Sequence, residues 1–254
     1  MNARKLFFAG LVATLPVAGL SHGSAILMAF GSTPYSGTES PGNEDGLVTG
    51  TTWNVLASDS SSFVDENGVA VTDLTADFGT GNNAAVDYSQ ATRAAAWSGN
   101  QPYPLWDTGL GQDNVVRDTG GLIGVALEID GLAPGVYDFY LSAFRGDGVD
   151  NPGRDYDVRW DVSGSAITDF SSIAATTLTN ASPTSVSTWN PGENYATGQF
   201  TIDGTNTALY LHVESDSFIG VMNSLEIVPV PEPGTLALLG LGGAMTLLRR
   251  RSQA

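Results

Sequence analysis

The sequence predicts an all-β protein, an antiparallel β-sandwich of the jelly-roll type. Two observations lead to this. Apolar and polar residues alternate with a period of two along several runs, as they do in strands with one buried face. Clusters of Gly, Asn, Asp, Ser and Pro separate these runs, and no amphipathic helix of useful length lies between them. No internal repeat or second domain is evident, so one sandwich of roughly ten strands is expected.

The strands are predicted from this alternation in chain order. It is clearest at 123–129, 137–143, 156–162 and 209–213, and each of these runs is expected to have one dry and one wet face. Further strands are predicted at 26–30, 51–57, 71–78, 172–177, 198–203 and 219–228. His212 falls on the polar side of its run and is therefore expected to be an isolated surface residue.

The C-terminus has three parts. Prolines make 229–233 an extended linker, because proline disfavours helix interiors and central strands. Residues 234–248 are uncharged and would span about 22 Å as a helix, less than the ~30 Å of a bilayer core. The tail 249–254 begins with three arginines, which favour a cytoplasmic location. This order predicts a short, provisional transmembrane helix.

The tail also carries a motif. Its residues are Val230, Pro231, Glu232 and Pro233, then the apolar run, then Arg249, Arg250 and Arg251. This order resembles the PEP-CTERM sorting signal of Gram-negative bacteria. The resemblance implies recognition and processing near Pro-Glu-Pro by an exosortase, a membrane transpeptidase. It implies an exported protein of a species that makes extracellular polysaccharide, and it concerns sorting rather than activity.

The N-terminus predicts export as well. Arg4 and Lys5 precede an apolar run at 6–20, and Gly23 and Ala25 are small residues at positions −3 and −1 of a cleavage after Ala25. Residues 1–25 are therefore predicted to be a signal peptide, with the Sec translocon and signal peptidase as partners. The ectodomain would then span 26–228.

The predicted ectodomain is strongly acidic. It keeps five arginines and no lysine against 26 acidic residues, a net charge of −21. Such a surface repels phosphate backbones, so nucleic acid is not an expected partner. The chain has no cysteine, which excludes disulfides and thiolate-bound metals. Stability must come from the core, with calcium as a possible structural ion.

Two segments resemble parts of galactose-binding-like sandwiches. They are 131–139, with the sequence Gly-Leu-Ala-Pro-Gly-Val-Tyr-Asp-Phe, and 218–227, which resembles the last strand of such domains. The segment 25–31, with Trp53 downstream, also looks like the opening of many exported PEP-CTERM proteins. These resemblances imply a fold and, by analogy alone, carbohydrate binding.

Two groups of residues are candidates for binding. Hard oxygen ligands for calcium gather on one Gly- and Pro-containing loop, although their spacing is not that of an EF-hand and a solvated acidic turn is the alternative. These residues are Asp147, Asp150, Asn151 and Asp155. Aromatic rings beside polar groups suit a glycan, the alternative being rings that cap the ends of the sandwich. These residues are Trp106, Asp107, Trp189 and Asn190.

The function expected from these features is non-catalytic. A single histidine in the ectodomain and the lack of a Gly-x-Ser-x-Gly elbow or phosphate loop leave no nucleophilic catalyst in view. The expected role is glycan binding or structure at the cell surface or in an extracellular polysaccharide (biofilm) matrix. A glycoside hydrolase or lyase with a carboxylate pair is the alternative, and a purely structural or adhesive protein is a third possibility.

Overall fold

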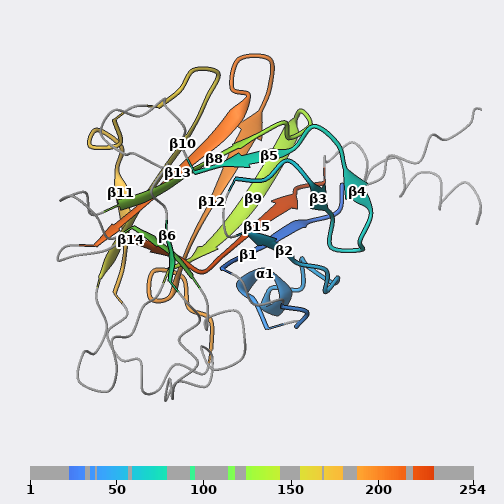
Figure 1. Cartoon of the computed structure of the whole chain (residues 1–254), viewed down its shortest axis with the longest axis horizontal. Coiled ribbons are helices and arrows are strands. Elements are labelled where there is room, and N and C mark those ends of the chain that lie inside the picture. Colours follow the sequence, from blue (N-terminus) through green and yellow to red (C-terminus); the bar gives the residue numbers. More distant parts are fainter. Residues whose placement is uncertain are drawn as a thin grey trace, which may run out of the picture.

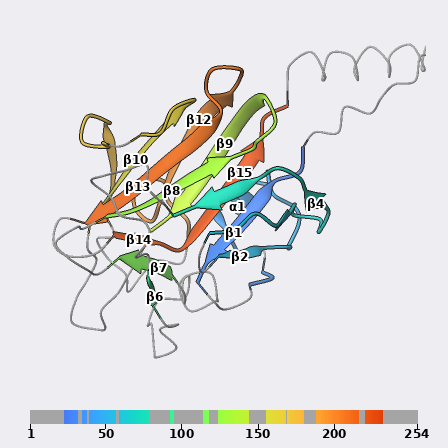
Figure 2. The ribbon, with the colours of Figure 1, turned by 45° about the horizontal axis from the view of Figure 1, so that its top comes forward.

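The predicted class is confirmed. The structure, a computed structural model, describes residues 23–31, 35–37, 39–56, 59–78, 92–94, 114–117, 124–143, 155–167, 169–179, 188–215 and 220–231. Within these residues the chain forms strands and one short helix. Two five-stranded sheets pack against each other as a β-sandwich (Figures 1 and 2).

The first sheet joins the two ends of the described chain. Its order is β12-β9-β15-β1-β2, and its neighbours are antiparallel except for the parallel pair β1 and β2. The strands are β1 (Ile26–Phe30), β2 (Asn54–Leu56), β9 (Gly135–Ser142), β12 (Tyr195–Ile202) and β15 (Ser224–Pro229).

The second sheet is antiparallel throughout, in the order β11-β10-β13-β8-β5. Its strands are β5 (Thr75–Asp77), β8 (Gly124–Asp130), β10 (Tyr156–Ser163), β11 (Ala175–Leu178) and β13 (Ala208–Ser215). All four runs with the clearest alternation therefore form strands: β8, β10 and β13 in this sheet, and β9 in the first.

The smaller elements differ most from the prediction. The run 71–78 is divided between β4 (Ala70–Val71) and β5, and 219–228 between β14 (Gly220–Met222) and β15. Elements that the sequence did not predict are β3 (Phe63–Val64), β6 (Thr92–Ala94), β7 (Asn114–Arg117) and α1 (Pro41–Glu44). They have two to four residues each, too few for a period to be recognised.

The core lies between the two sheets. Phe139 on β9 meets Trp160 on β10 edge to face, with ring centroids 5.0 Å apart, and Phe200 on β12 lies beside it at 6.3 Å. Gly198 makes this packing possible, because a Cβ there would lie 2.8 Å from Phe139 Cε1. The inward positions of β1, β15, β8 and β13 complete the core with Ile26, Met28, Leu225, Ile227, Val125, Leu127, Leu209 and Leu211.

The prediction of one wet face for each strand is wrong for β8 and β13. Only Glu214 of β13 is not buried, and β8 is buried on both faces up to Ala126. The reason is that segments between the strands fold over the outer faces: Phe170 lies over the second sheet. On the first sheet, residues around α1 cover β1 and β15 (Figure 1). Strand alternation alone does not reveal such covers.

The two ends of the described chain lie side by side, at the end of the sandwich opposite β6 and β7 (Figure 2). A Cβ on Gly23 would lie 3.2 Å from Pro229 Cγ. Val230 N donates to Val136 O at 2.8 Å, so pairing with β9 continues into the predicted linker. Proline has no N–H to donate. The nitrogen of Pro229 faces away from β9, and on its other side β1 begins only at Ile26, so the proline costs the sheet no hydrogen bond.

Among the described residues, no helix has the length and apolar character needed to cross a bilayer. The predicted transmembrane helix at 234–248 and the signal peptide residues 1–22 lie outside the described part of the chain.

The turn between β3 and β4 depends on Gly68, whose φ is +81°. Replacing Gly68 by alanine should destabilise the fold by about 1–2 kcal/mol, because a side chain in this left-handed conformation is strained. Gly204→Ala is the matched control, since no atom lies within 4 Å of its Cβ position and its φ is outside that region. Urea unfolding of both variants measures the difference, and equal stabilities would contradict the assigned turn.

Candidate functional site

The predicted glycan residues are only partly described. Trp189 is 8% exposed, and Asn190 beside it is exposed and donates through Nδ2 to Glu193 Oε2 at 3.0 Å. A ring covered to this extent offers little face to a sugar, so the geometry favours the alternative of a packing role for Trp189. Trp106 and Asp107 lie outside the described residues.

Trp189 belongs to a second apolar cluster on the outer face of the first sheet. It meets Tyr195 edge to face at 6.4 Å, and Tyr195 contacts Tyr140 at 5.8 Å. Tyr195 is the first residue of β12. Trp53 and Tyr35 extend this cluster near α1, with ring centroids 5.2 Å apart. These rings therefore fill the space between the sheet and the segment that contains α1.

A carboxyl group is sealed beneath this segment. Glu226 on β15 is 0% exposed and accepts bonds from Ser40 Oγ at 3.0 Å and Gly42 N at 3.2 Å. Burial raises the pKa of Glu226 to about 7; the bonds from Gly42 and Ser40 oppose this shift and the charge of Asp45 adds to it. Burial, then Asp45, also raises the pKa of Tyr140. Glu226 therefore changes its protonation near neutral pH while the fold covers it.

Sequence reasoning missed Glu226, although a signal was present. It is a lone acid in the otherwise apolar run 225–228 that closes the ectodomain. From the sequence, an acid on the outer side of such a strand is expected to face water. The residues that bury Glu226, Ser40 and Gly42, are 186 and 184 positions away in the sequence.

The predicted calcium loop is described only at its last residue. Asp155 precedes β10 and is exposed, whereas Asp147, Asp150 and Asn151 lie outside the described residues. Within the described part of the chain, no group of three or more His, Asp or Glu side chains could hold a metal ion.

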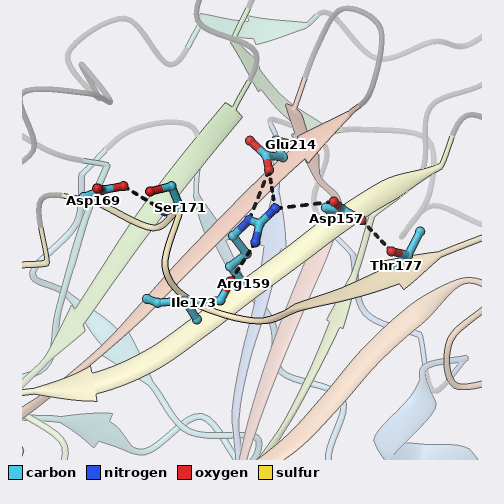
Figure 3. A network of polar contacts seen from close by, with 7 residues as sticks. All are labelled: Asp157, Arg159, Asp169, Ser171, Ile173, Thr177 and Glu214. Carbon is cyan, nitrogen blue, oxygen red and sulfur yellow. Dashed lines mark hydrogen bonds and ion pairs between the residues drawn. The ribbon is translucent and has the colours of Figure 1, made fainter.

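The outer face of the second sheet carries an ion-pair network centred on Arg159 (Figure 3). Its guanidinium donates from Nε and Nη2 to Glu214 Oε1 at 3.1 and 2.9 Å, and Nη1 donates to Ile173 O at 2.6 Å. Asp157 Oδ2 lies 3.5 Å from Nη2, and Asp157 Oδ1 accepts from Thr177 at 2.6 Å. Arg159 thereby fastens the 169–173 segment to β10 and β13.

The predicted environment of His212, an isolated place on the surface, is wrong. It lies on the outer face, as the alternation predicted, but it is 6% exposed because the Phe170 ring stacks on it at 5.0 Å. Gly124 on β8 leaves room for the imidazole, since a Cβ there would collide with Nε2. Burial lowers the pKa of His212 to about 4, with Glu214 opposing and Arg159 adding to the shift. Its Nδ1 has no partner among the described residues.

Several exposed aspartates cap turns. Asp203 Oδ1 accepts from Thr205 N at 2.6 Å and from Asn206 N at 2.7 Å, and Asp169 Oδ1 accepts from Ser171 N at 2.8 Å. The bonds from Asn206 and Thr205 lower the pKa of Asp203. Part of the acidic composition thus has a structural use, because these carboxylates replace the missing backbone acceptors of tight turns.

A cavity of about 450 Å³ lies at the edge of the sandwich where the described chain begins and ends. Gly23, Ser24, Asp65 and Pro229 line it among others. Val230 is half-buried and Pro231 exposed, so the Pro-Glu-Pro motif begins where the packed fold ends. The remaining sorting residues (Glu232, Pro233, Arg249, Arg250 and Arg251) lie outside the described residues.

Residues 229–252 match the family model of the PEP-CTERM protein-sorting motif. The tail resemblance inferred from the sequence is thereby confirmed for this segment. The motif indicates an exported protein that is anchored in the membrane and then processed by an exosortase.

The rest of the chain has only distant likenesses, and no curated protein matches it. The Bacillus subtilis protein YXIM is 14% identical over 82% of this chain and 40% of its own, with a TM-score of 0.40. The ANX1 ectodomain of Arabidopsis thaliana is 12% identical over 83% and 42%, with a TM-score of 0.36. TmCBM61, solved in complex with beta-1,4-galactotriose, is 11% identical over 47% and 72%, with a TM-score of 0.25. This chain spans less than half of the first two, and none of these likenesses assigns an activity.

Proposed function

We propose that this exported protein acts at the cell surface or in the extracellular polysaccharide matrix of a Gram-negative bacterium. Its β-sandwich serves there as a non-catalytic, glycan-binding or structural module. The observation that carries the proposal is the sorting motif at 229–252, because it directs the domain to the outside of the cell. The exosortase releases the domain from its membrane helix at the end of sorting.

The use of the described carboxylates supports a non-catalytic role. A glycosidase needs two carboxyl groups that both face a substrate. Glu226 is covered by the α1 segment, and Glu66, 8% exposed, accepts bonds from three backbone N–H groups. Asp203 and Asp169 cap turns. Each of these acids therefore helps to hold the fold together.

The strand order supports the jelly-roll form of the sandwich. Eight of its strands have the order β12-β9-β15-β1 in one sheet and β11-β10-β13-β8 in the other, which is the arrangement of two Greek keys. We assign the glycan contact to Trp106 and Asp107, with Asn190, and we assign a structural calcium ion to the loop of Asp147, Asp150, Asn151 and Asp155.

Glycan binding is tested with the processed protein purified from the culture medium. We expect retention on matrix polysaccharide or on a glycan array, and about tenfold weaker binding for Trp106→Ala, the loss of one stacked ring. Asn190→Ala should weaken binding without affecting the fold, because Asn190 is exposed. Trp189→Ala is unsuitable as a test, since its ring is buried and the variant would change stability as well.

Two further readouts separate the alternatives. A chelator should reduce the melting temperature if the calcium loop is occupied. Release of reducing sugar from the polysaccharide would contradict the non-catalytic role and establish a hydrolase or a lyase. Wild-type binding that neither Trp106→Ala nor Asn190→Ala changes would contradict the assigned glycan contact.

A further inference from the structure

Residues 24 and 25 are built into the fold. Ala25 is 2% exposed; its N–H donates to Glu66 Oε1 at 3.3 Å, and its carbonyl accepts from Glu66 N at 2.8 Å. Ser24 Oγ accepts from Asn67 Nδ2 at 3.1 Å, and the Asp65 carboxylate lies near enough to the Ser24 side chain to interact with it. Residues of the turn between β3 and β4 therefore hydrogen-bond to both Ser24 and Ala25.

This arrangement conflicts with a cleavage after Ala25. Such a cut would remove Ala25 from the outer apolar cluster and leave Glu66 N–H without its acceptor. It would also create a charged amino group on Ile26, which is 6% exposed and pairs with Ile227 in the sheet. A buried, unpaired charge at the start of a central strand is costly.

We propose that the signal peptide is instead cut between Gly23 and Ser24, and that the Asp65–Asn67 turn holds the new N-terminus. Water adds across the Gly23–Ser24 peptide bond; Gly23 leaves with the carboxylate, and Ser24 keeps the α-amino group. Ser21 and Gly23 are the small residues that signal peptidase requires at −3 and −1. The inference rests on the proposed export and names the bond at which it is completed.

The surroundings of Ser24 suit a new ammonium group. Gly23 is exposed and Ser24 is half-buried, so the charge stays in contact with water. The cavity of about 450 Å³ lined by Gly23, Ser24 and Asp65 keeps this end hydrated. The Asp65 carboxylate, which lies near the Ser24 side chain, supplies an opposite charge. The one charge that the cut leaves on the mature chain therefore appears where it can be solvated and paired.

The sequence offers a second small-residue pair, Gly19 and Ser21, whose cut would begin the protein at His22. That product would carry two residues before Ser24. Its α-amino group would then be on His22 and not on Ser24, the residue that contacts the Asp65–Asn67 turn. Cuts after Ser21, Gly23 and Ala25 give different masses and different first residues, so one measurement distinguishes them.

The test is N-terminal sequencing and intact mass of the full-length gene product, expressed in a Gram-negative host and recovered outside the cytoplasm. We expect Ser24 as the first residue. Gly23→Leu should abolish processing because a large residue blocks −1, whereas Ala25→Leu, now at +2, should be processed as the wild type is. Processing occurs at the membrane, so this comparison is independent of how well either variant folds afterwards.

An exported product that begins at Ile26 or His22 would overturn this inference and leave the proposed function intact. Normal processing of Gly23→Leu together with a block in Ala25→Leu would do the same. A product that keeps Met1 and stays in the cytoplasm would overturn the proposed export, and this inference with it.

Discussion

Replacing Glu226 by glutamine should stabilise the folded protein by about 3 kcal/mol above pH 7, with little effect at pH 4.5. The folded-state pKa of Glu226 is about 7, against 4.5 for an ordinary glutamate. Between these values the folded protein binds the proton and the unfolded chain does not. The Glu226 contribution to wild-type stability therefore falls as pH rises from 4.5 to 7, and glutamine, which stays neutral, removes that loss.

Urea unfolding of wild type and Glu226→Gln at several pH values between 4.5 and 8 measures this difference. Glutamine retains an acceptor for Gly42 N, and its amide can donate to Ser40 Oγ, so the covering segment stays in place. Glu39→Gln is the matched control: Glu39 is exposed on the same segment and should change stability by less than about 0.5 kcal/mol at every pH. A difference between wild type and Glu226→Gln that is independent of pH would contradict the buried position of this carboxyl.

Replacing His212 by leucine should have the opposite pH dependence. Burial holds the folded-state pKa of His212 at about 4, against 6.5 for an ordinary histidine, so the unfolded chain takes up a proton first as pH falls. Protonation of His212 should cost the wild type about 3 kcal/mol between pH 6.5 and pH 4, and His212→Leu should lack this contribution. The Phe170 ring and the recess above Gly124 accept an apolar side chain in place of the imidazole.

The measurement is again unfolding free energy against pH, supported by an NMR titration. Once His22 is removed with the signal peptide, as proposed above, His212 is the only histidine left, so its ring signals need no further assignment. A midpoint near 6.5 would place the imidazole in water and contradict the Phe170 cover. Between pH 4.5 and 6.5, Glu226 and His212 change the free energy of unfolding in opposite directions, so their effects partly cancel in the wild type. Glu226→Gln should therefore show the pH dependence caused by His212, and His212→Leu that caused by Glu226.

The prediction from sequence was good where a strand's own period reports its environment. The runs at 123–129, 137–143, 156–162 and 209–213 became β8, β9, β10 and β13, with the predicted residues facing the core. The tail motif was equally clear, because its order of Pro-Glu-Pro, apolar run and arginines is contiguous in the chain.

The prediction failed where burial depends on distant segments. His212 was expected in water because its strand alternates, yet Phe170 covers it. Glu226 is buried by Ser40 and Gly42, and Glu66 looks like a turn residue until its bonds to Ala25, Thr49 and Gly50 are known. Contacts of this kind join positions with no local pattern, so a period-based reading has no means of finding them.

We propose that this protein is an exported domain that is released from its C-terminal anchor by sorting. The most direct measurement is the intact mass and cell fraction of the protein in a host with an active exosortase and in the same host without it. We expect a product outside the cell that lacks residues 234–254 in the first host, and a membrane-bound product that keeps Arg249, Arg250 and Arg251 in the second. The same full-length, membrane-retained mass in both hosts would contradict the claim.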